Sequence, residues 1–160
     1  KVGKLPTLAC VYIDSDVRSF ADGPGLAPVE QSELCFIGGQ DLRPLVENPE
    51  GHAWLFQQIP GKVPADEIRK AAQGKGCGQV RAVGRVAVLA SMLNLREIFG
   101  RAVRRVQTLA AEMSSRMRTG AGQPEVHPAI YMVCSLAGGT GSGSFLDVAL
   151  LGRTIAGSLA

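Results

Sequence analysis

The sequence predicts an α/β protein with a three-layer, Rossmann-like parallel sheet, because strand-like and helix-like segments alternate along the chain. Two observations favour this class. Continuous apolar runs occur at 7–14 and 129–135, and a long stretch of apolar residues at helical spacing lies between them. Such continuous strands are typical of parallel sheets, whose two faces are both covered by helices. Ligands bind such sheets beyond the carboxyl ends of the strands, so the residues that follow each predicted strand are the candidates for function.

Length, composition and charge limit the classes of protein to which the chain can belong. Its 160 residues correspond to about one domain, and 46% hydrophobic against 19% charged residues indicate a folded globular chain. A net charge of +3 is too small to argue for a nucleic-acid or membrane partner. The apolar stretches are far shorter than the ~20 residues of a membrane span, and no signal-peptide pattern precedes the first strand.

The four cysteines have neither metal-ligand nor C-x-x-C spacing. This usage indicates free thiols in a reducing, cytoplasmic compartment rather than a disulfide scaffold. Three of the cysteines lie within apolar runs and are therefore predicted to be buried: Cys10, Cys35 and Cys134.

In the first half of the chain the predicted elements are a strand at 7–14, a loop at 21–32, a strand at 34–37, and helices at 41–47 and 65–72. The first strand ends in the polar cluster Asp14-Ser15-Asp16. The segment 40–73 has a Pro- and Gly-rich middle, and we expect it to be an insertion into the domain.

In the second half the predicted elements are a helical stretch at 83–117 broken near Asn94, a strand at 129–135, and a helix at 145–160. The glycines and proline of 120–124 end the long helical stretch. Ser144 and Asp147 are spaced like a capping box at the start of the last helix.

The run 138–144 (Gly-Gly-Thr-Gly-Ser-Gly-Ser) joins the last predicted strand to the last helix. Glycines in such a turn allow φ > 0, so that successive N–H groups form an anion-binding nest at the positive end of the helix dipole. A merely tight turn needs only one or two glycines, so this composition favours phosphate binding. The run is not a Walker loop, because Ser144 stands where the lysine is required, and it lacks the G-x-G-x-x-G of a dinucleotide fold.

The motif Gly-Gly-Thr-Gly-Ser-Gly at 138–143 closely resembles the signature of the superfamily of tubulins and the bacterial cell-division protein FtsZ. Two further segments are similar to this superfamily and occur in its order. Asp14-Ser15-Asp16 resembles the loop after an early strand, and Gly76-Cys77-Gly78 followed by Val83-Gly84-Arg85 resembles its second glycine loop, with Cys in place of Ala. The resemblance leaves out 40–73, and it fits a divergent bacterial tubulin-like protein of which 1–160 is a partial nucleotide-binding domain.

This resemblance implies binding of GTP or GDP, with Mg²⁺ as a companion ion and no metal-ligand set in the chain itself. In the superfamily a neighbouring subunit completes hydrolysis, so GTPase activity and assembly into filaments are linked. The catalytic residue is not identified, and the expected base-recognising and acidic segments lie beyond residue 160. The residues implied to contact the phosphates are Asp14, Gly76, Cys77, Gly78, Gly138, Gly139, Thr140, Gly141, Ser142 and Gly143.

Two other functions remain open from the sequence: a non-catalytic nucleotide-sensing or scaffold protein, and a degenerate P-loop ATPase. Asp14 and Asp16 suit a metal- or water-holding role and a capping role equally. Arg81 and Arg85 could reach a phosphate, but a solvated or salt-bridged role is favoured. The arginines of the long helix have no interleaved aromatic residues, so a solvated face is favoured over a nucleic-acid surface.

Overall fold

A parallel pair of strands lies at the centre of the fold. The computed structural model describes residues 8–21, 31–48, 50–51, 53, 65–116 and 129–158. Within these ranges β1 (Tyr12–Asp14) pairs with β2 (Leu34–Phe36), and Ile13 lies opposite Cys35. The described residues therefore form a mixed α/β fold with a two-stranded parallel sheet and a large share of helix.

The short helix α1 (Arg18–Ala21) packs against the sheet through aromatic rings. The ring of Phe20 contacts Tyr12 and Phe36 edge to face, with centroids 5.5 Å and 5.7 Å apart. Such edge-to-face pairs contribute roughly 1 kcal/mol beyond the area that they bury. A 3₁₀ turn, η1 (Gln31–Glu33), leads into β2.

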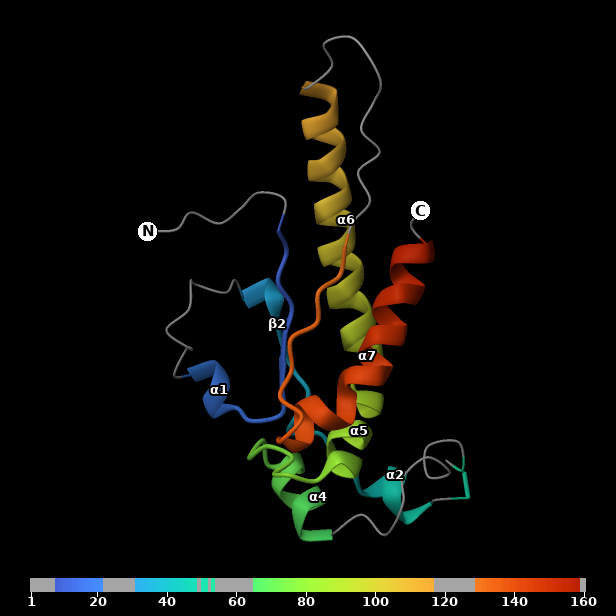
Figure 1. The fold of residues 1–160 in the computed structure, drawn as a ribbon. Coiled ribbons are helices and arrows are strands. Elements are labelled where there is room, and N and C mark those ends of the chain that lie inside the picture. Colours follow the sequence, from blue (N-terminus) through green and yellow to red (C-terminus); the bar gives the residue numbers. More distant parts are fainter. Residues whose placement is uncertain are drawn as a thin grey trace.

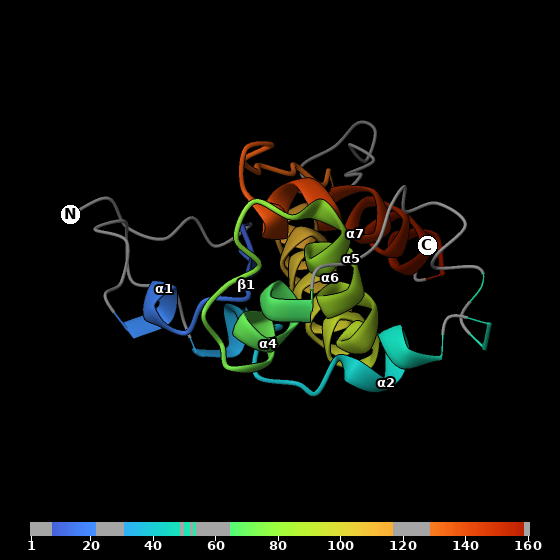
Figure 2. The same ribbon diagram turned by 90° about the horizontal axis from the view of Figure 1, so that it is seen from below.

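Helices make up the rest of the described structure (Figures 1 and 2). They are α2 (Arg43–Glu47), α4 (Ala65–Ala72), α5 (Arg81–Ala90), α6 (Met92–Arg116) and α7 (Gly139–Ser158). The long α6 and α7 lie side by side, and α5 packs against the first part of α7.

The degree of burial of α5 and α6 follows their apolar pattern. Four apolar side chains of α5 are completely buried, because this helix is apolar on nearly all sides and lies within the core. On α6 only one stripe is buried. Arg96, Arg101 and Glu97 are exposed, whereas Arg105 is half-buried and lies 3.6 Å from the carboxylate of buried Glu33. The core joins these helices to β2 and α7 through Cys35, Ile37, Val83, Val86, Ala87, Val88, Leu95, Ile98, Phe99, Val103, Val148 and Ile155.

The predicted break in the long helical stretch exists but lies at Ser91 rather than near Asn94. The Ser91 N–H donates to the carbonyls of Ala87 and Val88 and so closes α5. The Ser91 carbonyl then accepts from Leu95 and begins the new helix. Asn94 lies within α6, where its amide donates to the Cys35 Sγ over 3.7 Å.

The predicted strand at 129–135 is wrong for this structure, because this segment is outside the β1–β2 ladder. Every residue of 129–135 is exposed, and Tyr131 and Val133 are 88% and 97% exposed. Consequently the three-layer sheet expected from the sequence is not present among the described residues. Cys134 in this segment and Cys10 beside β1 are exposed rather than buried, whereas Cys35 is buried as predicted.

The last helix begins six residues earlier than the sequence predicts. It starts at Gly139, so most of the glycine run is helical. Ser144 is then an internal helix residue whose hydroxyl donates to the Gly141 carbonyl, and the predicted capping box with Asp147 does not form. The helices predicted at 41–47 and 65–72 and the strand at 34–37 are confirmed to within two residues.

Several sequence predictions lie outside the described residues. They concern Thr7, most of the loop at 21–32, the middle of 40–73, the end of the long helix at Met117, the 120–124 stop and the last two residues of the final helix. None of the described helices combines the length and apolar character that a membrane crossing requires.

Candidate functional site

The two glycine-rich segments meet directly beyond the carboxyl end of β1. The N–H of Gly139, the first residue of α7, donates to the carbonyl of Gly78 over 2.6 Å. Segments 74–78 and 138–143, far apart in sequence, therefore form one surface. This is the position at which a parallel sheet with crossover helices is expected to hold its ligand.

Segment 74–78 is an irregular loop that depends on glycine conformation. Gly74, Gly76 and Gly78 have φ of +71°, +83° and +55°, a region that other L-residues rarely adopt. The loop is bound to the end of β1, because the N–H of Val17 donates to Gly74 and the N–H of Gly76 donates to the Ser15 carbonyl. The positive-φ glycines let the loop that follows α4 (Ala65–Ala72) turn back onto the end of β1.

Segment 138–143 uses its glycines differently, and the predicted φ > 0 nest in it is wrong. None of its four glycines has a positive φ. A Cβ on Gly139 would lie 2.5 Å from the Cys77 carbonyl oxygen, and one on Gly141 would lie 2.6 Å from that of Ser135. Gly139, Gly141 and Gly143 are thus required because other backbone segments approach closely, so a bulky residue at Gly141 would disturb the fold as well as any ligand.

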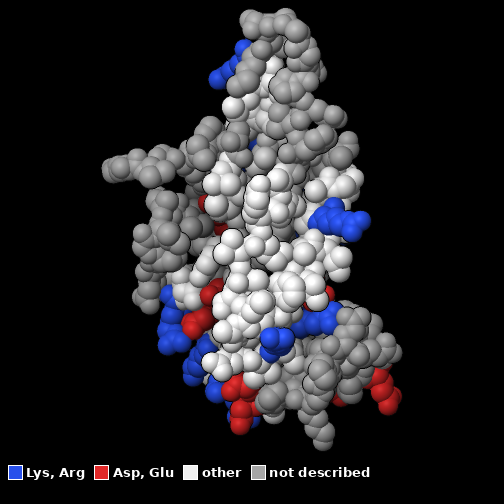
Figure 3. Space-filling view, viewed as in Figure 1, with Lys and Arg blue, Asp and Glu red and all other residues white. Residues whose placement is uncertain are grey.

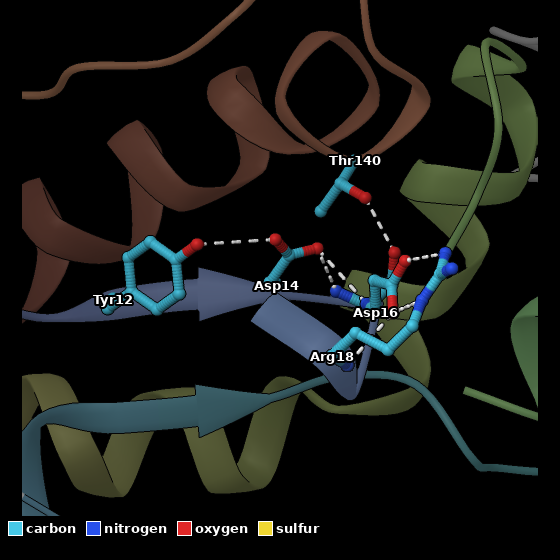
Figure 4. A network of polar contacts seen from close by, with 6 residues as sticks. Tyr12, Asp14, Asp16, Arg18 and Thr140 are labelled. Atoms are coloured by element: carbon cyan, nitrogen blue, oxygen red, sulfur yellow. Dashed lines mark hydrogen bonds and ion pairs between the residues drawn. The ribbon is translucent and has the colours of Figure 1, made fainter. Parts of the chain in front are cut away.

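Ser15 and Thr140 connect β1 to the glycine run. Their hydroxyls share a hydrogen bond of 2.6 Å, and Ser15 is fully buried (Figure 4). The thiol of Cys77 is also buried; burial raises its pKa, and hydrogen bonds with Ser15 and Thr140 offset part of that rise. The end of β1, segment 74–78 and segment 138–143 therefore meet at three small polar side chains, those of Ser15, Cys77 and Thr140.

The two aspartates at the end of β1 have separate partners (Figure 4). Asp14 Oδ1 accepts the N–H groups of Ser15 and Asp16 over 2.6 Å and 3.1 Å. The guanidinium of Arg18 lies 2.7 Å from Asp16 Oδ2 and lowers the pKa of that carboxyl. Both carboxylates thus take part in local turn and ion-pair contacts.

Arg85 does not point to a free anion position, because it forms an ion pair with Asp147 of α7. The two distances are 3.0 Å from Nε to Oδ2 and 3.2 Å from Nη2 to Oδ1. The salt-bridged alternative is therefore confirmed for Arg85, while Arg81 is exposed at the start of α5. Sequence reasoning missed Asp147 as a functional partner. The sequence did contain a signal for this pair, because Asp147 is the single acidic residue of 139–158.

Among the described residues, neither a metal-binding cluster nor a cleft gives a stronger candidate for a functional site than the two glycine segments. Within the described ranges no three His, Cys, Asp or Glu side chains lie close enough to hold a metal ion. A cleft of about 630 Å³ lies between α2 and α4, beside Asp41, Arg43 and Ile68, and no predicted phosphate-binding residue lines it. Charged side chains are sparse across the middle of the face shown in Figure 3 and more frequent at its lower end.

Comparison with known protein families agrees with this arrangement. The family model described as tubulin-like matches residues 2–160. The chain belongs to the tubulin-like family. The match includes 40–73, which the motif resemblance left out, as well as both glycine segments. No curated protein and no solved structure matches the chain.

Proposed function

We propose that this tubulin-like chain binds a guanine nucleotide, GTP or GDP, with its phosphates at the two glycine segments. One observation carries the proposal: Gly139 at the start of α7 bonds directly to Gly78 in the second loop, beyond the end of β1. Both segments resemble phosphate-contacting loops of one family, and their contact makes a single site from them.

The start of α7 is suited to an anion. A helix leaves its first N–H groups without intrahelical partners and directs a partial positive charge at them. The Gly139 N–H is used by Gly78, so Thr140 and Gly141 supply the next amides for a phosphate. Gly138, just before the helix, has no heavy atom of another described residue within 4 Å of where its Cβ would stand, apart from its chain neighbours, which leaves space there for a ligand group.

Hydrolysis is proposed as a property of an assembly rather than of these residues alone. A general base works best with a pKa near the working pH, but the ion pair with Arg18 lowers the pKa of Asp16. Asp14 is a turn acceptor that could hold Mg²⁺ through a water when nucleotide is bound. We propose that the water-positioning group comes from a neighbouring subunit in a filament, as the family resemblance implies.

Because Asp14 and Asp16 already have hydrogen-bond and ion-pair partners, they also favour one alternative function. In it the chain binds nucleotide without turnover and acts as a sensor or scaffold. Phosphate release from GTP at increasing protein concentration separates the two functions. Turnover that rises with concentration supports assembly-linked hydrolysis, and absence of turnover at all concentrations supports the sensor.

Gly138→Val tests the site itself. Within the described part of the chain, no atom beyond its sequence neighbours lies within 4 Å of the Cβ, so the new side chain should crowd a phosphate without disturbing the fold. We expect GTP affinity, measured by calorimetric titration, to fall at least about tenfold with an unchanged circular dichroism spectrum. Gly157→Val is the matched control, since Gly157 has equally open surroundings at the other end of α7.

Equal GTP affinity in both variants would remove segment 138–143 from the site. A parallel titration with ATP tests base preference: tighter binding of ATP than of GTP would favour the degenerate ATPase over a tubulin-like guanine site.

A further inference from the structure

The helices that follow the two glycine segments pack with their backbones almost in contact. A Cβ on Gly84 of α5 would lie 2.1 Å from the Gly139 carbonyl oxygen, and one on Gly143 of α7 would lie 2.2 Å from that of Arg81. Glycines on both helices make this approach possible. Gly84 and Gly143 have no side chains to interlock, so at this contact little resists sliding of one helix along the other.

One polar contact crosses this interface beside the glycines. Arg85 follows Gly84 in α5, Asp147 lies one turn beyond Gly143 in α7, and the guanidinium and carboxylate meet through two hydrogen bonds. The two side chains are only 19% and 13% exposed. A bidentate guanidinium–carboxylate pair restricts both the distance and the relative rotation of the groups that it joins.

We propose that Arg85 and Asp147 are a positioning pair that sets the register of α5 against α7, and thereby the fit between segments 74–78 and 138–143. The effect of this pair on nucleotide affinity rests on the proposed function. The effect of the pair on the geometry of the two segments is independent of that function.

Energetics favour a positioning role over a purely stabilising one. Removing two charges from water costs much of what their attraction returns, so a largely buried ion pair adds little net stability compared with apolar residues of similar size. Such pairs are better attested as devices that select one packing register. Here the register matters, because the N–H of Gly139 must reach the carbonyl of Gly78 at 2.6 Å.

Cys77 reports on this register without any nucleotide. It belongs to segment 74–78, its carbonyl lies against Gly139 of the other segment, and it is 1% exposed. Cys35 within β2 is equally buried and reports on global unfolding. In a Cys10→Ser, Cys134→Ser background, which removes the two exposed thiols, alkylation by iodoacetamide at each remaining cysteine can be followed by mass spectrometry.

The test variant is Arg85→Met with Asp147→Leu, which replaces the pair by apolar side chains. We expect Cys77 alkylation to accelerate about tenfold while Cys35 alkylation and the thermal unfolding midpoint stay unchanged. Arg85→Lys keeps the charge but loses the second hydrogen bond, so it should accelerate Cys77 alkylation to a lesser degree and remains informative if the double variant folds poorly. Arg101→Met with Glu97→Leu, an exposed pair on α6, is the matched control and should change neither rate.

A calorimetric GTP titration then connects the pair to the site, with affinity expected to fall about tenfold in the double variant only. Unchanged Cys77 alkylation would overturn the positioning role. Parallel acceleration at Cys77 and Cys35 would overturn it too, because it would indicate loss of global stability. If the unaltered protein bound no GTP, the proposed function would fail, while the alkylation rates would still decide the positioning role.

Discussion

The two glycine segments have similar composition but need glycine for different physical reasons. In 74–78 the alternating glycines adopt positive φ, so the backbone conformation requires them. In 138–143 the backbone is largely helical, and Gly139, Gly141 and Gly143 are required because carbonyl oxygens of other segments occupy the positions where Cβ atoms would stand. One segment depends on conformational freedom and the other on the absence of a side chain.

This difference shows that a glycine-rich run does not specify its own geometry. A nest of N–H groups at positive φ was predicted for 138–143, but the positive-φ glycines are in 74–78. An anion between the segments would therefore face a helix start on one side and an irregular loop on the other. The two kinds of glycine respond differently to substitution by alanine.

The largest effect is expected for Gly84→Ala, which tests the close approach of α5 to 138–143. Alanine normally stabilises a helix interior by up to about 1 kcal/mol relative to glycine. Here the new Cβ would lie 2.1 Å from a backbone oxygen of Gly139, so we expect the free energy of unfolding to fall by about 3 kcal/mol. Urea denaturation measures this free energy. Gly157→Ala is the control for alanine in a helix and should not lose stability. A neutral Gly84→Ala would contradict the backbone contact.

A smaller loss is expected for Gly76→Ala, which tests the conformational role in 74–78. The nearest atom to the new Cβ would be the Cβ of Asp16 at 3.5 Å, which is an ordinary van der Waals contact. Only the φ of +83° is therefore unfavourable for alanine. We expect a cost of about 1–2 kcal/mol, measured in the same urea experiment. Gly76→Asn should cost less, because asparagine tolerates the left-handed region better than alanine. Equal costs for both variants would argue for crowding instead.

Next in size is the hydroxyl contact that joins β1 to the glycine run. A double-mutant cycle of Ser15→Ala and Thr140→Val should give an interaction energy of about 1 kcal/mol, because the buried Ser15 hydroxyl shares a 2.6 Å hydrogen bond with the half-buried Thr140. The corresponding cycle for Arg43→Ala and Asp41→Ala, an exposed pair, is the control. Additive effects of the Ser15 and Thr140 substitutions would mean that this contact does not couple the two segments.

The smallest effect concerns the cysteines that accompany the two segments. Burial raises the pKa of Cys77 above 9.0, so the fold favours its neutral thiol. Its contribution to stability is complete below the ordinary pKa and is lost as the pH rises through the raised value. We expect the unfolding free energy to decline above about pH 9, and to decline less in Cys77→Ala. Cys134→Ala, at an exposed position before the other segment, should leave the decline unchanged.

Elements with a strong local pattern were predicted well from the sequence. The apolar spacing of α5 and α6, the short helix at 65–72 and, to within one residue, the strand predicted at 34–37 agree with the structure, because each has a pattern that local geometry largely determines. The strand predicted at 129–135 failed despite its apolar composition. A strand exists only where a neighbour accepts and donates its hydrogen bonds, and no local pattern supplies that neighbour.

By itself, the sequence determined where the two glycine segments lie, that a helix is associated with the end of each, and that one of them matches the tubulin-like signature. Only the tertiary structure decided which glycines adopt positive φ, where α7 begins and that Arg85 pairs with Asp147. The reason is that glycine permits many backbone conformations and an arginine many partners. The choice among them depends on contacts between residues that are far apart in the sequence.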